Sequence, residues 1–484
     1  TYRGVERIEN YAALTSIPET DLKVGAIYHV AGRVSTGDGG AGAFRVQAGA
    51  LLTADGGTVL NHDTASFQFR RLIENDSYIA SWFGATYAGL QAAAVSALAN
   101  GFKRLFISPG NWDFPADESL EIDGALELFG PPNAVLRSTV DRTAPVLHIT
   151  GDDVTVEGFR IVSTFAGDPA NDNHNVGMLV EDCTNFRNKG IDIVGRFYIS
   201  SRLRGVTKAK ESGIYYKGAK NRLNFVEEDC SDYVLDSFNL DGANELGTPY
   251  TFYPLNISSP DANGPKRLAV TNGTITNWTQ HMASVSGDWQ SPVLSNITGR
   301  TPSAAAAPAG FVVQSDNGRP TNVQVNNITV VGSEVPILLK EIDRVQGGNL
   351  MAKDATGAIA GIYVLNCTNV NLGEVTADGC AADGVLVHGQ TASSCTDVTI
   401  GPVHASNNGG KGVSVTSGTS NGARRIEVNI GKVFGNTGAA FTASASSDSV
   451  HFRGGEVSSN GSSGSNSSTN GTIRDVRGAT NTAL

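Results

Sequence analysis

The chain has 484 residues, of which 40% are hydrophobic and 17% charged, enough apolar material for a large buried core. A formal net charge of −11 argues against a nucleic-acid partner, which requires a basic surface. Five cysteines are too few for a disulfide scaffold and fit assembly in a reducing cytoplasm. The first residues lack a basic-then-apolar leader, and no run approaches the ~18 apolar residues of a membrane span, so we expect no membrane insertion.

Residues 1–80 predict a small α/β neck or adaptor domain. The stretch "AALTSIPETDLKVGAIYHVAGRVSTGDGGAGAFRV" indicates a short helix, two strands and a glycine-rich loop. The segments "GGTVL" and "FRRLIEN" indicate further strands. Because the chain does not begin with methionine, we expect more residues to precede it in the natural protein.

The alanine-rich run "GLQAAAVSALANG" predicts a helix near residues 88–101. Its pattern is largely apolar, and Gly101 provides a stop signal. The strand "KRLFISPG" and the turn "NWDF" follow it. We expect this helix to cap the open end of the repetitive structure that begins here, because terminal repeats must shield the core from water.

Residues 81–475 contain a degenerate repeat, and residues 476–484 form a C-terminal tail. The phrase "CTNVNLGEVTADG" starts at Cys367, and "CTDVTIGPVHASNNG" starts at Cys395. Each copy predicts about three strands that are too short to form hairpins. Stacked as turns of a coil, such strands pair with their copies about 4.8 Å above and below. The fold class is therefore all-β, a single-stranded parallel β-helix, and residues 130–475 would hold roughly 13 turns.

The recurring cysteines are expected to pack at one corner of the coil. The sequence contains no CxxC pair and no Cys/His ligand spacing. We therefore predict that Cys367 and Cys395 are buried, and that the protein uses no metal and no cofactor.

The N-terminal motifs resemble those of bacteriophage tailspikes, polysaccharide depolymerases with a pectate-lyase-like right-handed parallel β-helix. The motifs, in residues 20–115, are "STGDGGAGAFRV", "DGGTVL", "SWFGA", the alanine-rich helix and "FISPGNWDF". The repeat pattern extends the likeness loosely to about residue 475. In that family the phrase after Phe-Gly-Ala carries Gly-Asp-Gly and an aspartate pair; this chain has "TYAGLQAA", so we expect no such aspartate function.

The resemblance implies a homotrimer on a virion tail, attached through a part that precedes this chain. Such a protein is assembled in the host cytoplasm and acts at the outer surface of the bacterium. The resemblance implies that it binds and cuts bacterial surface polysaccharide, either capsule or lipopolysaccharide O-antigen. A β-helix by itself fits an adhesin equally well.

A change from basic to acidic composition in the middle of the chain indicates where a functional site could lie. Residues 181–222 hold ten basic and four acidic side chains, whereas residues 223–261 hold eight acidic and no basic ones. Mutual charge compensation on a solvated face accounts for such blocks equally well. A locally basic groove on an acidic protein would instead attract an anionic glycan. Segments 195–212 and 242–266 lack clean strand alternation, and we expect them to form projecting loops.

A period of two predicts which side chains of the step face outward. Ile214 and Tyr216 would point inward in "GIYYKG", and Leu223 and Phe225 in "RLNFVEE". The remaining side chains would then point outward on one surface: Tyr215, Lys217, Arg222, Asn224 and Glu228. The catalytic candidates are Tyr215, Lys217, Arg222, Glu228 and Asp232. The substrate-binding candidates are Arg202, Arg204, Asn224, Asp241, Trp278, His281 and Trp289.

The candidate residues permit two reactions. A lyase acting on a uronic acid needs a cation for the carboxylate, a base for the C5 proton and an acid for the leaving oxygen, roles open to Lys217, Arg222 and Tyr215. A glycosidase needs two carboxyls, which Glu228 could supply with Asp232 or Asp241. The local cationic excess favours the lyase narrowly.

A second candidate region is "NWTQHMASVSGDW". Exposed Trp278 and Trp289 would stack on sugar rings, and His281 would serve as a base near neutral pH. Tryptophans packed at corners and a hydrogen-bonded surface histidine are the structural alternative. A non-catalytic glycan-binding fibre or adhesin and a structural spacer are competing functions, and the charge step argues only against the spacer.

Overall fold

A computed structural model describes most of the chain and divides it into two compact units, residues 1–193 and 194–484. Strands make up 54% of the chain and helices 6%. None of the helices in the described part of the chain is long and apolar enough to span a membrane. The described ranges are 7–49, 51–73, 76–169, 175–227, 229–244, 250–258, 266–301, 308–315, 319–390, 395–418 and 422–478.

The first unit begins with a small five-stranded sheet in the order β1-β2-β3-β5-β4. Its elements are β1 (Arg7–Ile8), α1 (Tyr11–Thr15), η1 (Glu19–Asp21), β2 (Ile27–Val30), β3 (Gly42–Ala48), β4 (Val59–Asn61) and β5 (Phe67–Arg71). Leu14, Phe44, Val46 and Phe69 are fully buried in its core. The predicted short helix and flanking strands are confirmed.

The predicted capping helix is α2 (Tyr87–Ala99), which follows η2 (Ala80–Phe83). The hydroxyl of Thr86 accepts a hydrogen bond from the Gly89 N–H at 3.2 Å, which caps the first turn. Leu90 and Ala94 are fully buried, and the helix packs on η2, β7, β8 and β9. Gly101 has a φ of 75°, a backbone angle that suits glycine after a helix end.

The coil of residues 1–193 consists of short parallel strands. Its strands are β6 (Ser77–Ile79), β7 (Arg104–Phe106), β8 (Gly110–Phe114), β9 (Leu120–Ile122), β10 (Glu127–Phe129), β11 (Ala134–Ser138), β12 (Leu147–Ile149), β13 (Thr155–Glu157), β14 (Arg160–Ser163), β15 (Val176–Glu181), β16 (Arg187–Lys189) and β17 (Asp192–Gly195). Tyr78 of β6 pairs with Leu105 of β7, so stacking starts before residue 130. The described strands therefore make about 17 turns instead of the roughly 13 expected.

The coil of residues 194–484 has two faces, which we call the wide sheet and the narrow sheet. The wide sheet contains β19 (Lys210–Ser212), β20 (Tyr215–Lys217), β22 (Tyr233–Asp241), β24 (Leu268–Thr276), β26 (Val293–Arg300), β28 (Thr321–Val331), β30 (Asp343–Lys353), β32 (Thr368–Leu372), β33 (Val375–Asp378), β35 (Cys395–Ser406), β37 (Ala423–Phe434), β39 (Asp448–Arg453), β40 (Glu456–Ser458) and β42 (Thr472–Arg474). The narrow sheet contains β18 (Ile199–Arg204), β21 (Arg222–Val226), β23 (Tyr253–Ser258), β25 (His281–Ser286), β27 (Ala309–Gln314), β29 (Val335–Lys340), β31 (Ala360–Leu365), β34 (Asp383–Gly389), β36 (Val413–Ser417), β38 (Phe441–Ala443) and β41 (Ser465–Asn466).

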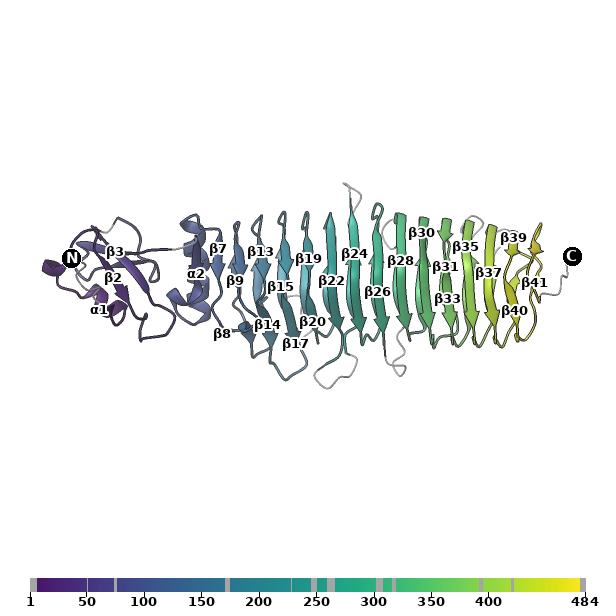
Figure 1. The fold of residues 1–484 in the computed structure, drawn as a ribbon, viewed down its shortest axis with the longest axis horizontal. Coiled ribbons are helices and arrows are strands. Elements are labelled where there is room, and N and C mark those ends of the chain that lie inside the picture. The colour runs from purple at the N-terminus through teal and green to yellow at the C-terminus, as the bar shows by residue number, and fades with distance from the viewer. Residues whose placement is uncertain are drawn as a thin grey trace. The chain divides into compact units, whose positions relative to one another are not determined.

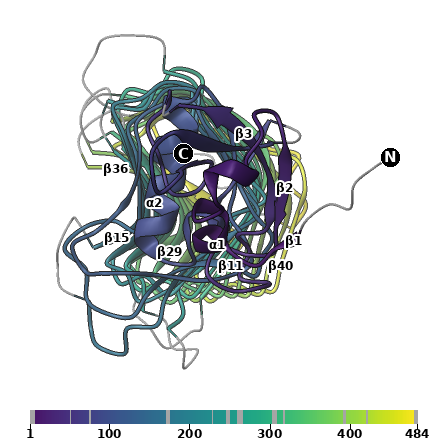
Figure 2. The same ribbon diagram turned by 90° about the vertical axis from the view of Figure 1, so that its left-hand side faces the viewer.

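Parallel pairing holds successive turns of this second unit in register. Strands from β19 to β40 lie side by side in Figure 1, and the turns of residues 194–484 superimpose in the end-on view of Figure 2. Aliphatic side chains such as Val325, Ile362 and Val398 fill the interior and are fully buried. The predicted parallel β-helix with an N-terminal neck and a capping helix is confirmed.

The recurring phrase marks equivalent positions on adjacent turns. Val375 pairs with Val403, as its spacing predicts. Cys367 and Cys395 are both fully buried, and burial raises the pKa of the Cys367 thiol to about 12. Their predicted packing role is confirmed. A register shift at Val403 places Ala405, rather than Val403, opposite Val433 on the next turn.

Candidate functional site

The outer face of the narrow sheet carries cationic and aromatic side chains on successive turns. Arg222 of β21 pairs in register with Tyr253 of β23, and Arg202 of β18 pairs with Phe225. The ring of Tyr253 in turn contacts that of His281. We call this group the Arg222 cluster; its members are Arg202, Arg222, Phe225, Glu227, Tyr253 and His281.

A bend in each strand creates this face. Leu223 and the following Asn224 are both fully buried, and so are Met282 and Ala283 one position apart in β25. Consecutive strand residues normally point to opposite faces, so two adjacent inward side chains mark a bend. Arg222 and Phe225, which flank the buried pair, both remain half-buried on the outer side.

Arg222 is the centre of the cluster. Its guanidinium carbon lies 4.0 Å from the ring centroid of Phe225 and 5.6 Å from that of Tyr253. Burial lowers the pKa of Arg222, while nearby Tyr198, Tyr253 and Glu227 act in the opposite direction. Among the described residues Arg222 forms no ion pair, and its Nε has no hydrogen-bond partner. A partly desolvated guanidinium held over aromatic rings is suited to bind a planar carboxylate.

Arg202 differs from Arg222 because a carboxylate neutralises it. One of its terminal nitrogens lies 2.7 Å from Oε1 of Glu227. The two side chains are only 11% and 16% exposed. This pair therefore positions Glu227 beside the cluster and leaves Arg222 as the cation available to a ligand.

Tyr253 and His281 supply groups that can transfer protons. Their ring centroids are 5.3 Å apart with an interplanar angle of 30°, and both side chains are half-buried. An imidazole exchanges protons near neutral pH, and a phenol can act as an acid. The two groups come from adjacent turns, so the stacking of the coil places them together.

The structure brings together only part of the predicted set. Arg202, Arg222 and His281 lie on the narrow sheet, with Arg204 exposed at the end of β18. Tyr215 and Lys217 lie on β20 of the wide sheet. The prediction that Tyr215 and Lys217 share one surface with Arg222 is therefore wrong, because the chain turns a corner between β20 and β21.

Lys217 is occupied by a neighbouring carboxylate. Its Nζ lies 3.0 Å from Oδ2 of Asp241, its register partner on β22. The hydrogen bond with Asp241 raises the pKa of Lys217. Burial tends to raise the pKa of Asp241, but hydrogen bonds from Asn277, the Ala243 N–H and Lys217 outweigh it and lower that pKa. This bonding favours a structural ion pair, although the alternating orientation predicted for Tyr215 and Lys217 is confirmed by their half-exposed side chains.

The outward orientation predicted for Asn224 is wrong. Its side chain is fully buried inside the coil, where Nδ2 donates to Oε2 of Glu211 at 2.7 Å. Tyr216 and Tyr233 donate to the same carboxylate at 2.8 and 2.7 Å. The bend after Leu223 shifts the facing by one position, which also places Phe225 outside. Asn224 therefore belongs to an interior polar network.

The exposed tryptophan platform predicted near His281 is also wrong. Trp278 and Trp289 are fully buried. Trp278 follows a left-handed Asn277 at a corner, and Thr301 donates to its carbonyl at 3.2 Å. Large rings at these positions fill corners of the coil, so of the three predicted groups His281 is the one that is half-buried rather than fully buried.

The two remaining carboxylate candidates have different outcomes. Glu228 lies outside the described residues. Asp232 occupies a corner with a φ of 52° and forms an ion pair with Arg267 at 3.0 Å. The Arg267 side chain is 79% exposed, which is typical of a surface ion pair that contributes little to stability.

Sequence reasoning missed Phe225, Glu227 and Tyr253 as site residues. Phe225 was assigned to the core by strict alternation, and Tyr253 stands on the next turn from Arg222. The Leu-Asn that "RLNFV" and "YPLNI" share is no guide to Tyr253, because aligning it would place Pro254 opposite Arg222, one position from the observed partner.

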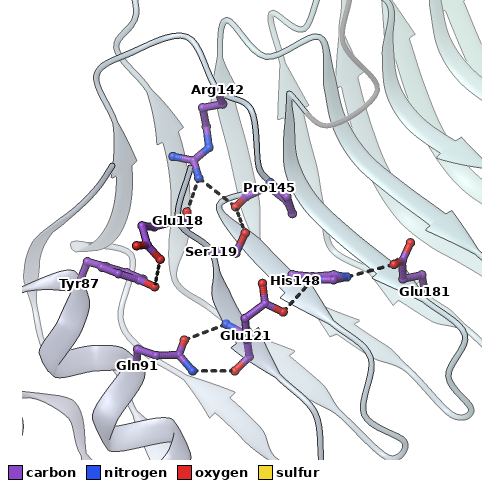
Figure 3. A network of polar contacts seen from close by, with 9 residues as sticks. All are labelled: Tyr87, Gln91, Glu118, Ser119, Glu121, Arg142, Pro145, His148 and Glu181. Carbon is purple, nitrogen blue, oxygen red and sulfur yellow. Dashed lines mark hydrogen bonds and ion pairs between the residues drawn. The ribbon is translucent and has the colours of Figure 1, made fainter. Parts of the chain in front are cut away.

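A second polar cluster lies in residues 1–193 and is shown in Figure 3. His148 lies between two carboxylates, with Nδ1 2.7 Å from Oε2 of Glu121 and Nε2 3.3 Å from Oε1 of Glu181. The hydrogen bond with Glu121 raises the pKa of His148, against the opposing effect of burial. Both ring nitrogens are thus engaged, which indicates a bridge between turns rather than a catalytic base.

Arg142 braces the same region (Figure 3). The residue is 2% exposed, and its guanidinium donates to the carbonyls of Glu118 and Pro145 at 2.5 and 2.9 Å. Burial lowers its pKa to about 10. Nearby, Tyr87 donates to Glu118 at 2.7 Å and its pKa is raised to about 12, mainly by burial. These contacts tie loops to the coil. Across the described ranges, no group of three His, Cys, Asp or Glu side chains is placed to hold a metal ion.

Comparison with known proteins supports the fold. No family model matches the chain, and no curated protein is significantly similar in sequence. The crystal structure of tailspike protein gp49 from Acinetobacter baumannii bacteriophage Fri1, a capsular polysaccharide depolymerase, superposes with a TM-score of 0.51 at 14% identity, covering 93% of this chain and 74% of that one. This similarity confirms the expected β-helix of tailspike type at the level of fold.

Two further structures are more distant. The enzymatically active domain of tailspike protein 2 from bacteriophage CBA120 has a TM-score of 0.38 at 12% identity, with 97% of this chain and 57% of that chain covered. The A-module of the Azotobacter vinelandii mannuronan C-5 epimerase AlgE6 has a TM-score of 0.35 at 12% identity, with 82% and 99% covered. Neither score is high enough to carry an argument about the site.

Proposed function

We propose that this protein is a phage tailspike depolymerase that binds and cleaves bacterial surface polysaccharide, capsule or O-antigen, at the Arg222 cluster. The observation that carries the proposal is the half-buried guanidinium of Arg222, 4.0 Å from the ring of Phe225 and without an ion-pair partner among the described residues. The tailspike-type fold and the N-terminal motifs support the assignment to a phage tail. We propose further that it acts as a homotrimer at the outer surface of the host.

The reaction that this arrangement favours is β-elimination at a uronic acid. Arg222 binds the uronate carboxylate through two parallel hydrogen bonds and stabilises the charge that develops when the C5 proton leaves. His281 takes that proton, the electrons form the C4–C5 double bond, and the C4–O bond breaks. Tyr253 donates a proton to the departing oxygen. No co-reactant is required.

Hydrolysis is less well supported by the described groups. A glycosidase needs two carboxyls about 5–9.5 Å apart, one of them protonated. Among the contacts described for the cluster, Glu227 is the one carboxylate, and Arg202 holds it at 2.7 Å. The ion pair with Arg202 occupies this carboxylate, and the contacts described for the cluster supply no second carboxyl to complete a catalytic pair.

The test is incubation of the protein with capsule and O-antigen preparations, including that of the true host. Chain length is followed by gel filtration and unsaturated uronates by ultraviolet absorbance. We expect shortening with rising absorbance, and a loss of about 100-fold or more in rate for Arg222→Gln. The matched control is Arg425→Gln, which removes an exposed arginine paired with Asp397.

Each other result selects a different function. Shortening without absorbance would establish a hydrolase and transfer the catalytic role to carboxylates. Binding without shortening would leave a glycan-binding adhesin. Equal rates for the Arg222→Gln and Arg425→Gln variants would refute the placement of the site.

A further inference from the structure

The outer face of the wide sheet contains an open groove of about 510 Å³, within residues 296–376. It extends over β26, β28, β30 and β33, all in the second unit. Its volume lies in the range of about 300–1,000 Å³ that is usual for ligand sites. The groove is on a different sheet from the Arg222 cluster.

A row of asparagines forms one side of the groove. Asn296, Asn327 and Asn349 all have left-handed backbone angles, with φ of 54–55°, at the same bend of successive strands. Nδ2 of each amide donates to Oδ1 of the preceding rung at 2.8–2.9 Å. An amide has two N–H groups, and the ladder uses one of them. The row therefore presents an exposed, regularly spaced set of donors.

A second row of uncharged side chains forms the floor. Thr298, Thr329, Met351 and Thr376 stand in register on four adjacent strands. An exposed sheet face usually carries charged residues, but here three hydroxyls flank one half-buried thioether. The rows follow the stacking direction, so four strands at about 4.8 Å spacing present roughly 14 Å of repeating hydrogen-bonding surface.

Charge is nearly absent from this groove. Of the described residues that line it, only Glu374 is charged, and its Oε1 lies 3.8 Å from Nε2 of His404 at one end. The Arg222 cluster, in contrast, has at its centre a cation that forms no ion pair within the described part of the chain. The two sites therefore favour different parts of a polysaccharide.

We propose that this groove binds an uncharged stretch of a glycan chain, along the stacking direction, while the Arg222 cluster acts on acidic sugars. Hydroxyls and amides of the two rows hydrogen-bond to neutral hexose or N-acetylhexosamine units, and Met351 contacts the apolar face of a ring or an acetamido methyl. A linear polymer matches a row that repeats at each turn better than a compact ligand does. The inference rests on the proposed function for the class of ligand only, since binding here requires no cleavage.

Methyl NMR of the full chain provides a direct test, because the sequence has three methionines. Met178 and Met282 are fully buried, whereas Met351 is half-buried in the groove floor. The probes are oligosaccharides from capsule and O-antigen, including the host's, whose uronates have been reduced to neutral sugars. We expect the Met351 methyl signal to shift on titration while the Met178 and Met282 signals stay unchanged.

Paired variants on one strand locate the binding. Thr329→Tyr fills the groove and should weaken binding of the neutral oligosaccharides at least tenfold. Gln324→Tyr places the same ring on an exposed position of the same strand, outside the groove, and should bind like the natural protein. Equal affinities for the two variants, or no Met351 shift with any reduced oligosaccharide at millimolar concentration, would overturn the proposal.

The outcome separates this proposal from the proposed function. A Met351 shift without cleavage of any polysaccharide would support the groove and refute the depolymerase. Cleavage with an unchanged Met351 signal would do the reverse. Arg222→Gln should abolish cleavage and leave the affinity for the neutral oligosaccharides unchanged.

Discussion

Replacing Glu211 with alanine is expected to destabilise the first turns of the second unit strongly. The carboxylate is fully buried inside the coil and accepts hydrogen bonds from Tyr216, Tyr233 and Asn224 at 2.7–2.8 Å. Leaving one buried donor without a partner costs about 1–3 kcal/mol. Part of that loss is relieved, because Asn224 Nδ2 already lies 3.0 Å from the Tyr233 hydroxyl. We expect a loss of about 3–5 kcal/mol in the free energy of local opening.

Glu211→Gln is the matched control, since it keeps the shape of the side chain. The amide oxygen can take the Oε2 position and accept from Tyr233 and Asn224, and the amide nitrogen then donates to the Tyr216 hydroxyl. Of the three donors, only the Tyr216 O–H gives up its carboxylate acceptor, so we expect a loss of about 1 kcal/mol. The alanine variant lacks any such rearrangement.

Hydrogen exchange of the amides in β19–β22 measures these losses locally. Each 1.4 kcal/mol corresponds to about a tenfold change in the opening equilibrium, so the alanine variant should exchange some hundredfold to thousandfold faster and the glutamine variant less than tenfold faster. Equal exchange in the two variants, or an alanine variant within about 1 kcal/mol of the natural protein, would refute the interior network as a stabilising element.

Three further predictions follow from described contacts. His148→Gln should reduce the free energy of unfolding of the first unit by about 1–2 kcal/mol at pH 6 and by less at pH 9, measured by urea unfolding. The folded-state pKa of His148 is raised, so protonation of the ring stabilises the folded state below the unfolded-state pKa, and this contribution disappears as the pH rises through the folded-state pKa. A loss that does not depend on pH would contradict this explanation. Asn436→Ala removes a buried asparagine and should lower the free energy of unfolding by about 2–4 kcal/mol, measured by thermal unfolding. Asn296→Gly removes an exposed asparagine with a left-handed backbone and should lower it by under about 1 kcal/mol. Similar losses for the two variants would show that burial does not determine how much such an asparagine stabilises the coil. Lys217→Gln should retain most depolymerase activity, since Asp241 already binds its ammonium group at 3.0 Å, and a hundredfold loss of rate would restore it as a catalytic candidate.

The fold was largely predictable because the spacing of a sequence repeat shows which residues pair between successive turns. The spacing of Val375 and Val403 equals one turn of the coil, so a local pattern contains the register of strands that are far apart in sequence. The capping helix was predictable for a different reason, since its composition and its Gly101 stop are local signals. The shift at Val403 was not predictable, because a bulge inserts residues without changing the hydrophobic pattern.

The site was only partly predictable because strict alternation fails at bends. In β21 the adjacent Leu223 and Asn224 both point inward, which reverses the facing of every later residue in the strand. A buried Asn224 is acceptable only because Glu211 from another strand accepts its hydrogen bond. That partner lies 13 residues earlier in the chain, and no local pattern pairs the two.

The change from basic to acidic residues after position 222 indicated the region of the site, but strand register determines which cation in that region is available to a ligand. Lys217, Arg202 and Arg222 are equivalent cations in the sequence, yet Asp241 neutralises the first and Glu227 the second. Charge compensation between the neighbouring blocks therefore accounts for these two cations. Arg222 escapes it because the next turn places Tyr253, rather than a carboxylate, opposite its strand position. Arg222 is partly desolvated and has no counter-ion among the described residues, which raises the energy of the free protein, and an anionic ligand would remove that cost.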